Sequence, residues 1–148
     1  MSVPHRSLDS PMLVSHIALI IPCIWWLFGK NRGDYFSHVI DKFMASMLTV
    51  AILFSYLYHF YYESVLYFAE ETYMYFAVLI LNAYLIYRGV SGYVIAAGIL
   101  MLLLLKYSVE FCQRTRVGQS AYEILHPYCH YVGGLYVLYC VHFIQKSF

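Results

Sequence analysis

The sequence predicts an all-α fold, a polytopic transmembrane helix bundle of about five spans, and two observations lead to this prediction. Of the 148 residues, 62% are hydrophobic and 11% are charged, whereas soluble domains usually have about 25% charged residues. The apolar residues also gather into runs close to the length of about 20 residues that a helix needs to cross a bilayer. We therefore expect a multi-pass integral membrane protein with a single transmembrane domain, residues 1–148.

The first two predicted spans cover residues 12–28 and 43–61. The first ends with Trp25 and Trp26, an aromatic pair typical of a membrane interface, rather than with the small residues of a signal-peptide cleavage site. The connection between the two spans, residues 30–42, is rich in polar and turn-forming residues. This composition predicts a loop outside the bilayer.

The other three predicted spans cover residues 73–87, 93–107 and 126–144. Acidic residues precede the third span: Glu63, Glu70 and Glu71. A tight return from Arg88 to Gly92 leads to the fourth span, whose Ile, Leu and Ala content predicts a lipid-facing helix. Residues 110–123 predict a loop or a short interfacial segment. Proline is tolerated in the first turn of a helix, so Pro127 predicts that the last helix starts near His126.

Successive spans run in opposite directions, so the ionisable residues at their ends divide between two sides. One side receives His59, Glu63, Glu70, Glu71, His126 and His130, and the other receives Asp34, His38, Asp41 and His142. Asp41 lies about 27 Å from His59 at 1.5 Å per helical residue, so it cannot share a site with that histidine. His16 starts the first span on the side of His59. Its spacing does not require a functional role, and we expect it, like His38 and His142, to be a packing residue.

Three histidines are candidate metal ligands. Ser55 and His59 lie one helical turn apart on one face, and His126 and His130 have the same spacing. Burying ionisable groups unpaired in a membrane is costly, which favours a functional role for such a set. Three histidines with a water as fourth ligand form a familiar catalytic zinc site. The sequence therefore predicts a zinc site at His59, His126 and His130.

These segments resemble motifs of a known superfamily. Residues 54–59, Phe-Ser-Tyr-Leu-Tyr-His, are similar to the Ser-x-x-x-His motif that closes an early helix in the CREST membrane hydrolases, which include alkaline ceramidases and the adiponectin-receptor family. Residues 126–134 are similar to the His-x-x-x-His segment that opens their last helix. The resemblance implies His59, His126 and His130 as zinc ligands and Ser55 as a polar partner of the reacting centre.

The chain departs from this superfamily at two points. The superfamily usually has an aspartate near the start of its third helix, whereas the corresponding residue here is Glu70. We take Glu70 as the candidate proton-transfer residue, with Glu63 and Glu71 as alternatives. The superfamily normally has seven spans, so the chain resembles a shortened, five-helix member.

The predicted function is that of a zinc-dependent intramembrane hydrolase, in which metal-activated water attacks a lipid amide or ester. A non-catalytic channel or scaffold with a structural metal stays open, as does a small haem-binding protein. The i, i+4 histidine pair argues against haem, whose axial ligands come from opposite faces. The expected partner is a membrane lipid, and self-association is a further option.

Charge and cysteine content exclude other classes of partner and site. A formal net charge of +1, with scattered basic residues, argues against a nucleic-acid partner. The four cysteines include no Cys-x-x-Cys motif and do not identify a redox compartment. Basic residues are nearly balanced between the two sides, so the sequence predicts neither the orientation nor which membrane holds the chain.

Overall fold

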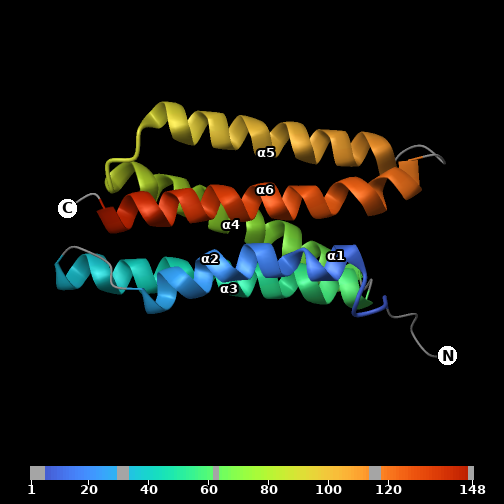
Figure 1. Cartoon of the computed structure of the whole chain (residues 1–148), viewed down its shortest axis with the longest axis horizontal. Helices are drawn as coiled ribbons and strands as arrows, with labels where there is room; N and C mark the ends of the chain where they lie inside the picture. Colours follow the sequence, from blue (N-terminus) through green and yellow to red (C-terminus); the bar gives the residue numbers. More distant parts are fainter. Residues whose placement is uncertain (1–5, 30–33, 62–63, 114–117, 147–148) are drawn as a thin grey trace.

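The computed structural model is an all-α bundle, which confirms the predicted class (Figure 1). It describes residues 6–29, 34–61, 64–113 and 118–146, and no strand occurs in these four ranges. The helices are α1 (Pro11–Val14), α2 (His16–Phe28), α3 (Tyr35–Tyr61), α4 (Ser64–Tyr87), α5 (Gly92–Gln113) and α6 (Gly118–Lys146). Since α1 and α2 form one segment interrupted at Ser15, the chain passes along the bundle five times.

Successive passes run in opposite directions along the long axis of the bundle (Figure 1). Helix α2 packs against α3 and α6, α4 packs mainly on α3, and α5 packs mainly on α6 and contacts α4 weakly. The start of α2, the end of α3 and the starts of α4 and α6 therefore lie at one end, which we call the histidine end because His16, His59, His126 and His130 are there. The C-terminus lies at the opposite end.

Among the described residues, two segments are long and apolar enough to cross a membrane. They are Pro11–Phe28, which comprises α1, Ser15 and α2 over 18 residues, and Tyr35–Tyr61, which is the whole of α3 over 27 residues. Gly92–Ser108 is a shorter apolar helix. Length and composition thus mark the first two passes as candidate membrane spans.

A short helical break positions His16. Pro11 occupies the first turn of α1, and the Ser10 side chain caps that turn by accepting from the Leu13 N–H, as serine does at helix starts. Ser15 ends α1, and its hydroxyl donates to the Met12 carbonyl at 2.9 Å. The break turns Ser15 and His16 into the interior, where both side chains are buried.

The prediction that residues 30–42 form a loop is wrong from Tyr35 onward, and residues 30–33 lie outside the described ranges. Helix α3 begins at Tyr35, and Asp41 is fully buried within it. The Arg88 guanidinium lies 3.0 Å from both Asp41 carboxylate oxygens, and the Tyr84 hydroxyl donates to the same carboxylate. Arg88 also donates to the Ile144 carbonyl at 3.3 Å. A polar residue that suggests a loop can lie inside the bundle when its charge is paired in this way.

We expect Asp41→Asn to destabilise the bundle by about 3–5 kcal/mol, because it leaves the Arg88 charge buried without its carboxylate partner. Lys42→Gln is the matched control, since Lys42 is exposed on the same helix. The measurement is the free energy of unfolding of both variants in mixed micelles. Equal unfolding free energies for the two variants would show that the buried pair does not hold the far end of the bundle together.

The helices also extend beyond three of the predicted spans. Helix α4 begins at Ser64 and already contains Glu70 and Glu71, while Glu63 lies outside the described residues. Helix α5 extends to Gln113, and α6 begins at Gly118, so most of the segment 110–123 is helical. Polar residues continue these helices because several of them find partners across the bundle, such as Glu71 with Lys106.

Pro127 lies inside α6, not in its first turn. Lacking an N–H, it cannot bond to the carbonyl of Glu123 one turn earlier, and the helix continues through this missing bond. His126 is therefore in the interior of the helix rather than at its start.

Glycine is required at Gly134 and at Gly89. At Gly134 of α6, an added Cβ would lie 2.2 Å from the Ala18 carbonyl oxygen of α2, so only glycine permits this close approach, one turn beyond His130. Gly89 has a φ of 77° in the turn between α4 and α5, a conformation that other residues adopt rarely. The first glycine brings α6 against α2 next to the histidines, and the second makes the tight return that the sequence predicts.

Candidate metal centre

Four histidine side chains meet at the histidine end of the bundle. His16 comes from the first turn of α2, His59 from the last turn of α3, and His126 and His130 from successive turns of α6. The ring centroid of His59 lies 4.8 Å from that of His126 and 5.8 Å from that of His130. The ring centroids of His126 and His130 are 4.8 Å apart. The structure therefore brings the three predicted ligands together.

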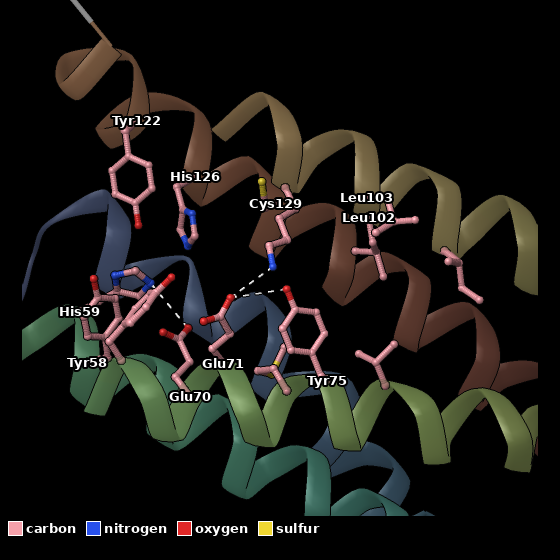
Figure 2. Close-up of a pocket in the computed structure, with 15 residues that line it drawn as sticks. Tyr58, His59, Glu70, Glu71, Tyr75, Leu102, Leu103, Tyr122, His126 and Cys129 are labelled. Carbon is pink, nitrogen blue, oxygen red and sulfur yellow. Dashed lines mark hydrogen bonds and ion pairs between the residues drawn. The ribbon is translucent and has the colours of Figure 1, made fainter. Parts of the chain in front are cut away.

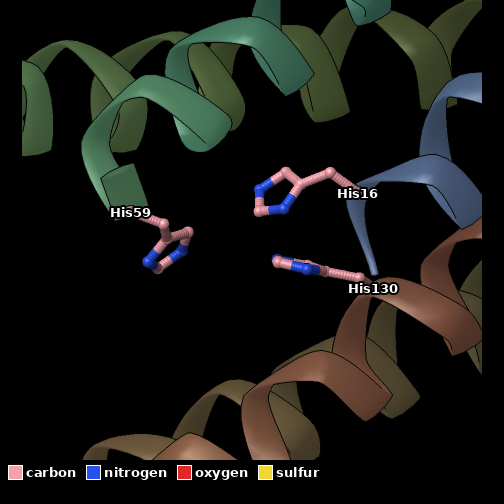
Figure 3. A group of neighbouring side chains, drawn as sticks. All are labelled: His16, His59 and His130. Carbon is pink, nitrogen blue, oxygen red and sulfur yellow. The ribbon is translucent and has the colours of Figure 1, made fainter. Parts of the chain in front are cut away.

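His16 also belongs to this cluster, although we expected it to be a packing residue. Its ring centroid lies 4.1 Å from that of His130 and 5.5 Å from that of His59 (Figure 3). The ligand nitrogens of His16, His59 and His130 all lie within 4.8 Å of one another, and the three residues are buried. This group could hold a metal ion. The only sequence signal for His16 was its place on the same side of the bundle as His59.

Hydrogen bonds fix the tautomer of His16. Its Nδ1 lies 2.9 Å from the Met12 carbonyl oxygen, which can only accept. Nδ1 must therefore carry the proton, and Nε2 keeps its lone pair. The Ser55 hydroxyl lies 3.1 Å from that Nε2. His16 thus directs an unprotonated nitrogen toward the centre of the cluster.

A second hydrogen-bond chain orients His130 in the same way. Its Nδ1 lies 2.7 Å from the Ser15 hydroxyl, whose own proton goes to the Met12 carbonyl. Ser15 can therefore only accept from His130, which places the imidazole proton on Nδ1 and leaves Nε2 free. Metal-bound histidines commonly donate their second nitrogen to an oxygen in this manner. The Met12 carbonyl therefore orients both histidines: it accepts a hydrogen bond from His16 directly, and it accepts one from Ser15, which in turn accepts from His130.

His59 is the least satisfied residue of the cluster. Its side chain is 1% exposed, and neither ring nitrogen has a hydrogen-bond partner among the described residues. His126 Nδ1 is also buried without such a partner. An unsatisfied buried polar group costs about 1–3 kcal/mol, and a bound cation would remove that cost. The donor set therefore fits a metal ion.

We expect Ser15→Ala to weaken metal binding by about 10- to 100-fold, the usual effect of losing a residue that orients a ligand. The substitution removes the acceptor of the His130 Nδ1 proton. Ser46→Ala is the control, because Ser46 is exposed on α3. Competition with a calibrated chelator measures the affinity, and Ser15→Thr should recover part of it. An affinity equal to that of Ser46→Ala would remove Ser15 from the site.

Ser55 and Glu70, the predicted catalytic residues, both border the histidines. Ser55 is buried beside His16, and Glu70 Oε1 lies 4.0 Å from His59 Nε2. Burial raises the pKa of the Glu70 carboxyl above its usual value; a hydrogen bond with Ser55 opposes this shift, and neighbouring Glu71 adds to it. Ser55 therefore lies between an imidazole and a carboxylate. Glu71 faces away, toward Lys106.

A cavity of about 340 Å³ adjoins the cluster, between α4, α5 and α6 (Figure 2). His59, Glu70, Tyr122 and His126 border one end. The rest of the lining includes Glu71, Tyr75, Lys106 and a group of apolar side chains: Met74, Val78, Ile99, Leu102 and Leu103. The volume lies within the range of about 300–1,000 Å³ that is usual for small-molecule sites. A ligand with a hydrocarbon chain could thus place its polar part next to the histidines.

The chain matches no family model, no curated protein and no solved structure.

Proposed function

We propose that the chain is a multi-pass membrane protein and acts as a zinc-dependent hydrolase of lipid amides or esters. The observation that carries this proposal is the buried histidine cluster, with its unsatisfied nitrogens, at one end of a largely apolar cavity. The resemblance of residues 54–59 and 126–134 to the CREST hydrolases supports the same function.

The membrane part of the proposal rests on the first four passes. In addition to the two candidate spans, α4 and α5 carry large apolar side chains that are well exposed. Examples are Phe76, Leu79, Ile86, Leu100 and Leu104. Such extended apolar surface is rare on soluble monomers, whereas helices that satisfy their own backbone can present it to lipid. A bilayer around the bundle would cover these faces.

Two ligand sets share His59 and His130. Nitrogen distances favour His16 as the third ligand, while the resemblance implies His126, which also lines the cavity. Neutral imidazoles suit zinc. When bound with one open position, zinc supplies an activated water and polarises a carbonyl.

The chain's own residues would supply proton transfer and orientation. Glu70, beside His59 and partly buried, is placed to move a proton between water and the leaving group. The Ser55 hydroxyl lies between His16 and Glu70. It has a single proton, so it can donate a hydrogen bond to a developing oxyanion only when neither neighbour accepts that proton. The apolar wall would hold the lipid chain and exclude water from the reacting end.

A structural metal site is the second candidate function. Four imidazoles lie in the cluster, and four protein ligands close a tetrahedral zinc site without a position for water. The haem alternative is disfavoured, because rings with centroids 4.1–5.8 Å apart leave little room for a flat macrocycle among them.

Lipid hydrolysis by the purified full chain in nanodiscs separates the two candidates. The assay measures fatty-acid release from ceramide-like amides and from phospholipid esters, with metal content recorded for every sample. We expect release that is lost after chelation and restored by zinc. A protein that holds stoichiometric zinc and releases fatty acid from neither lipid would instead be a structural metal protein.

A further inference from the structure

One ion pair of the cavity wall has no part in the proposed reaction. Lys106 Nζ on α5 lies 3.4 Å from Glu71 Oε1 on α4 and 4.3 Å from the centroid of the Tyr75 ring. The Tyr75 hydroxyl donates to the same carboxylate at 3.5 Å. Figure 2 shows Glu71 and Tyr75 of this group between the histidine end of the cavity and the apolar end at Leu102 and Leu103. Two opposite charges thus face the cavity where it changes from polar to apolar.

This pair can open easily. The Glu71 and Lys106 side chains are 38% and 36% exposed, and ion pairs with that exposure contribute little to stability. The Asp41–Arg88 pair at the other end of the bundle is a contrast, since its side chains are 0% and 2% exposed. A ligand that replaces both halves of the weak pair would leave the net charge of the cavity unchanged.

A zwitterionic head is the ligand group that replaces both halves. Its phosphate would take the place of the carboxylate beside Lys106, and its ammonium would take the place of Nζ beside Glu71 and over the Tyr75 ring, where a quaternary ammonium also gains a cation–π contact. An anionic head would meet repulsion from Glu71. A neutral head would leave the pair closed and gain neither contact.

We propose that the Glu71–Lys106 pair is a recognition site for the head of a zwitterionic phospholipid whose hydrocarbon chain lies along the apolar end of the cavity. Glu71 adjoins Glu70 on α4, so a head bound there lies next to the proposed proton-transfer residue. As a statement about the substrate, the inference rests on the proposed function.

Binding of ether-linked lysolipids tests this inference separately from hydrolysis, because ethers are not cleaved by ester or amide hydrolases. The purified full chain in detergent is titrated with three probes of one chain length: a lysophosphatidylcholine, a lysophosphatidic acid and a monoalkylglycerol. We expect the zwitterionic probe to bind about three- to tenfold more tightly than the other two, as half-exposed charge contacts allow.

Variants assign this preference to the pair. Glu71→Gln should shift the preference toward the anionic probe, and Lys106→Gln should reduce zwitterion binding to the level of the neutral probe. The double exchange Glu71→Lys with Lys106→Glu should restore part of the preference over the neutral probe. Lys146→Gln, at the opposite end of the bundle, should change none of the three affinities.

Equal binding of the three probes by the parent would overturn the inference, as would a shift by Lys146→Gln as large as that by Glu71→Gln. A head preference without hydrolysis of any ester or amide would leave the recognition site standing and contradict the proposed function. Hydrolysis without a head preference would support the proposed function and contradict the recognition site.

Discussion

We expect His130→Ala to abolish zinc binding and His142→Ala to leave the zinc content at about one ion per chain, because only the first removes a ligand of a small tetrahedral set. His130 belongs to both possible ligand sets and is held by Ser15, so its loss removes a nitrogen that no neighbour can replace. His142 takes part in none of these contacts and is exposed near the far end of α6, which makes it a histidine control on the same helix.

The same measurement decides the third ligand. If the nitrogen distances identify the set, His16→Ala loses zinc and His126→Ala keeps it; if the resemblance identifies the set, the two results are exchanged. Metal analysis of detergent-purified protein, with circular dichroism to confirm helical content, gives both answers. Equal zinc content in His130→Ala and His142→Ala would contradict the assignment of the metal centre.

Glu70→Gln should keep the zinc and lower turnover by about 10²- to 10⁴-fold, the range typical of general acid–base residues. Glutamine preserves the shape of the side chain but cannot carry a proton between water and the leaving group. Glu70 Oε1 lies 4.0 Å from His59 Nε2, close enough to act beside a metal held there. Glu70→Asp should have a milder effect, because it keeps the carboxylate and only shortens its reach.

Three other glutamates make the test specific. Glu123→Gln is the control, since Glu123 pairs with Arg6 and its side chain is 52% exposed. Glu71→Gln and Glu63→Gln test the alternatives that the sequence leaves open. Turnover of Glu70→Gln equal to the parent, together with a loss in one of these two, would transfer the role to that neighbour. Zinc loss in Glu70→Gln would show instead that Glu70 is a ligand.

The sequence predicted the helical class and the end of the bundle at which the histidines meet, because both follow from apolar runs and alternating direction. It did not predict that Asp41 is buried, since its partner Arg88 lies 47 residues away and leaves no local signal. A charged residue in a polar stretch suggests a loop unless its partner is known.

The role of His16 could not be predicted for a similar reason. The hydrogen bonds that orient it and His130 both depend on the Met12 carbonyl and on the break at Ser15. Backbone acceptors of this kind have no sequence motif. The spacing within one helix, by contrast, was sufficient to predict that His126 lies beside His130.

The coordination of zinc in the purified parent protein tests the central claim most directly. X-ray absorption at the zinc edge, combined with metal analysis and an optical spectrum, should show about one zinc per chain with imidazole nitrogens at about 2.0–2.1 Å, and no Soret band. A protein that stays metal-free after incubation with zinc, or that shows a haem spectrum, would contradict a zinc centre built from these histidines.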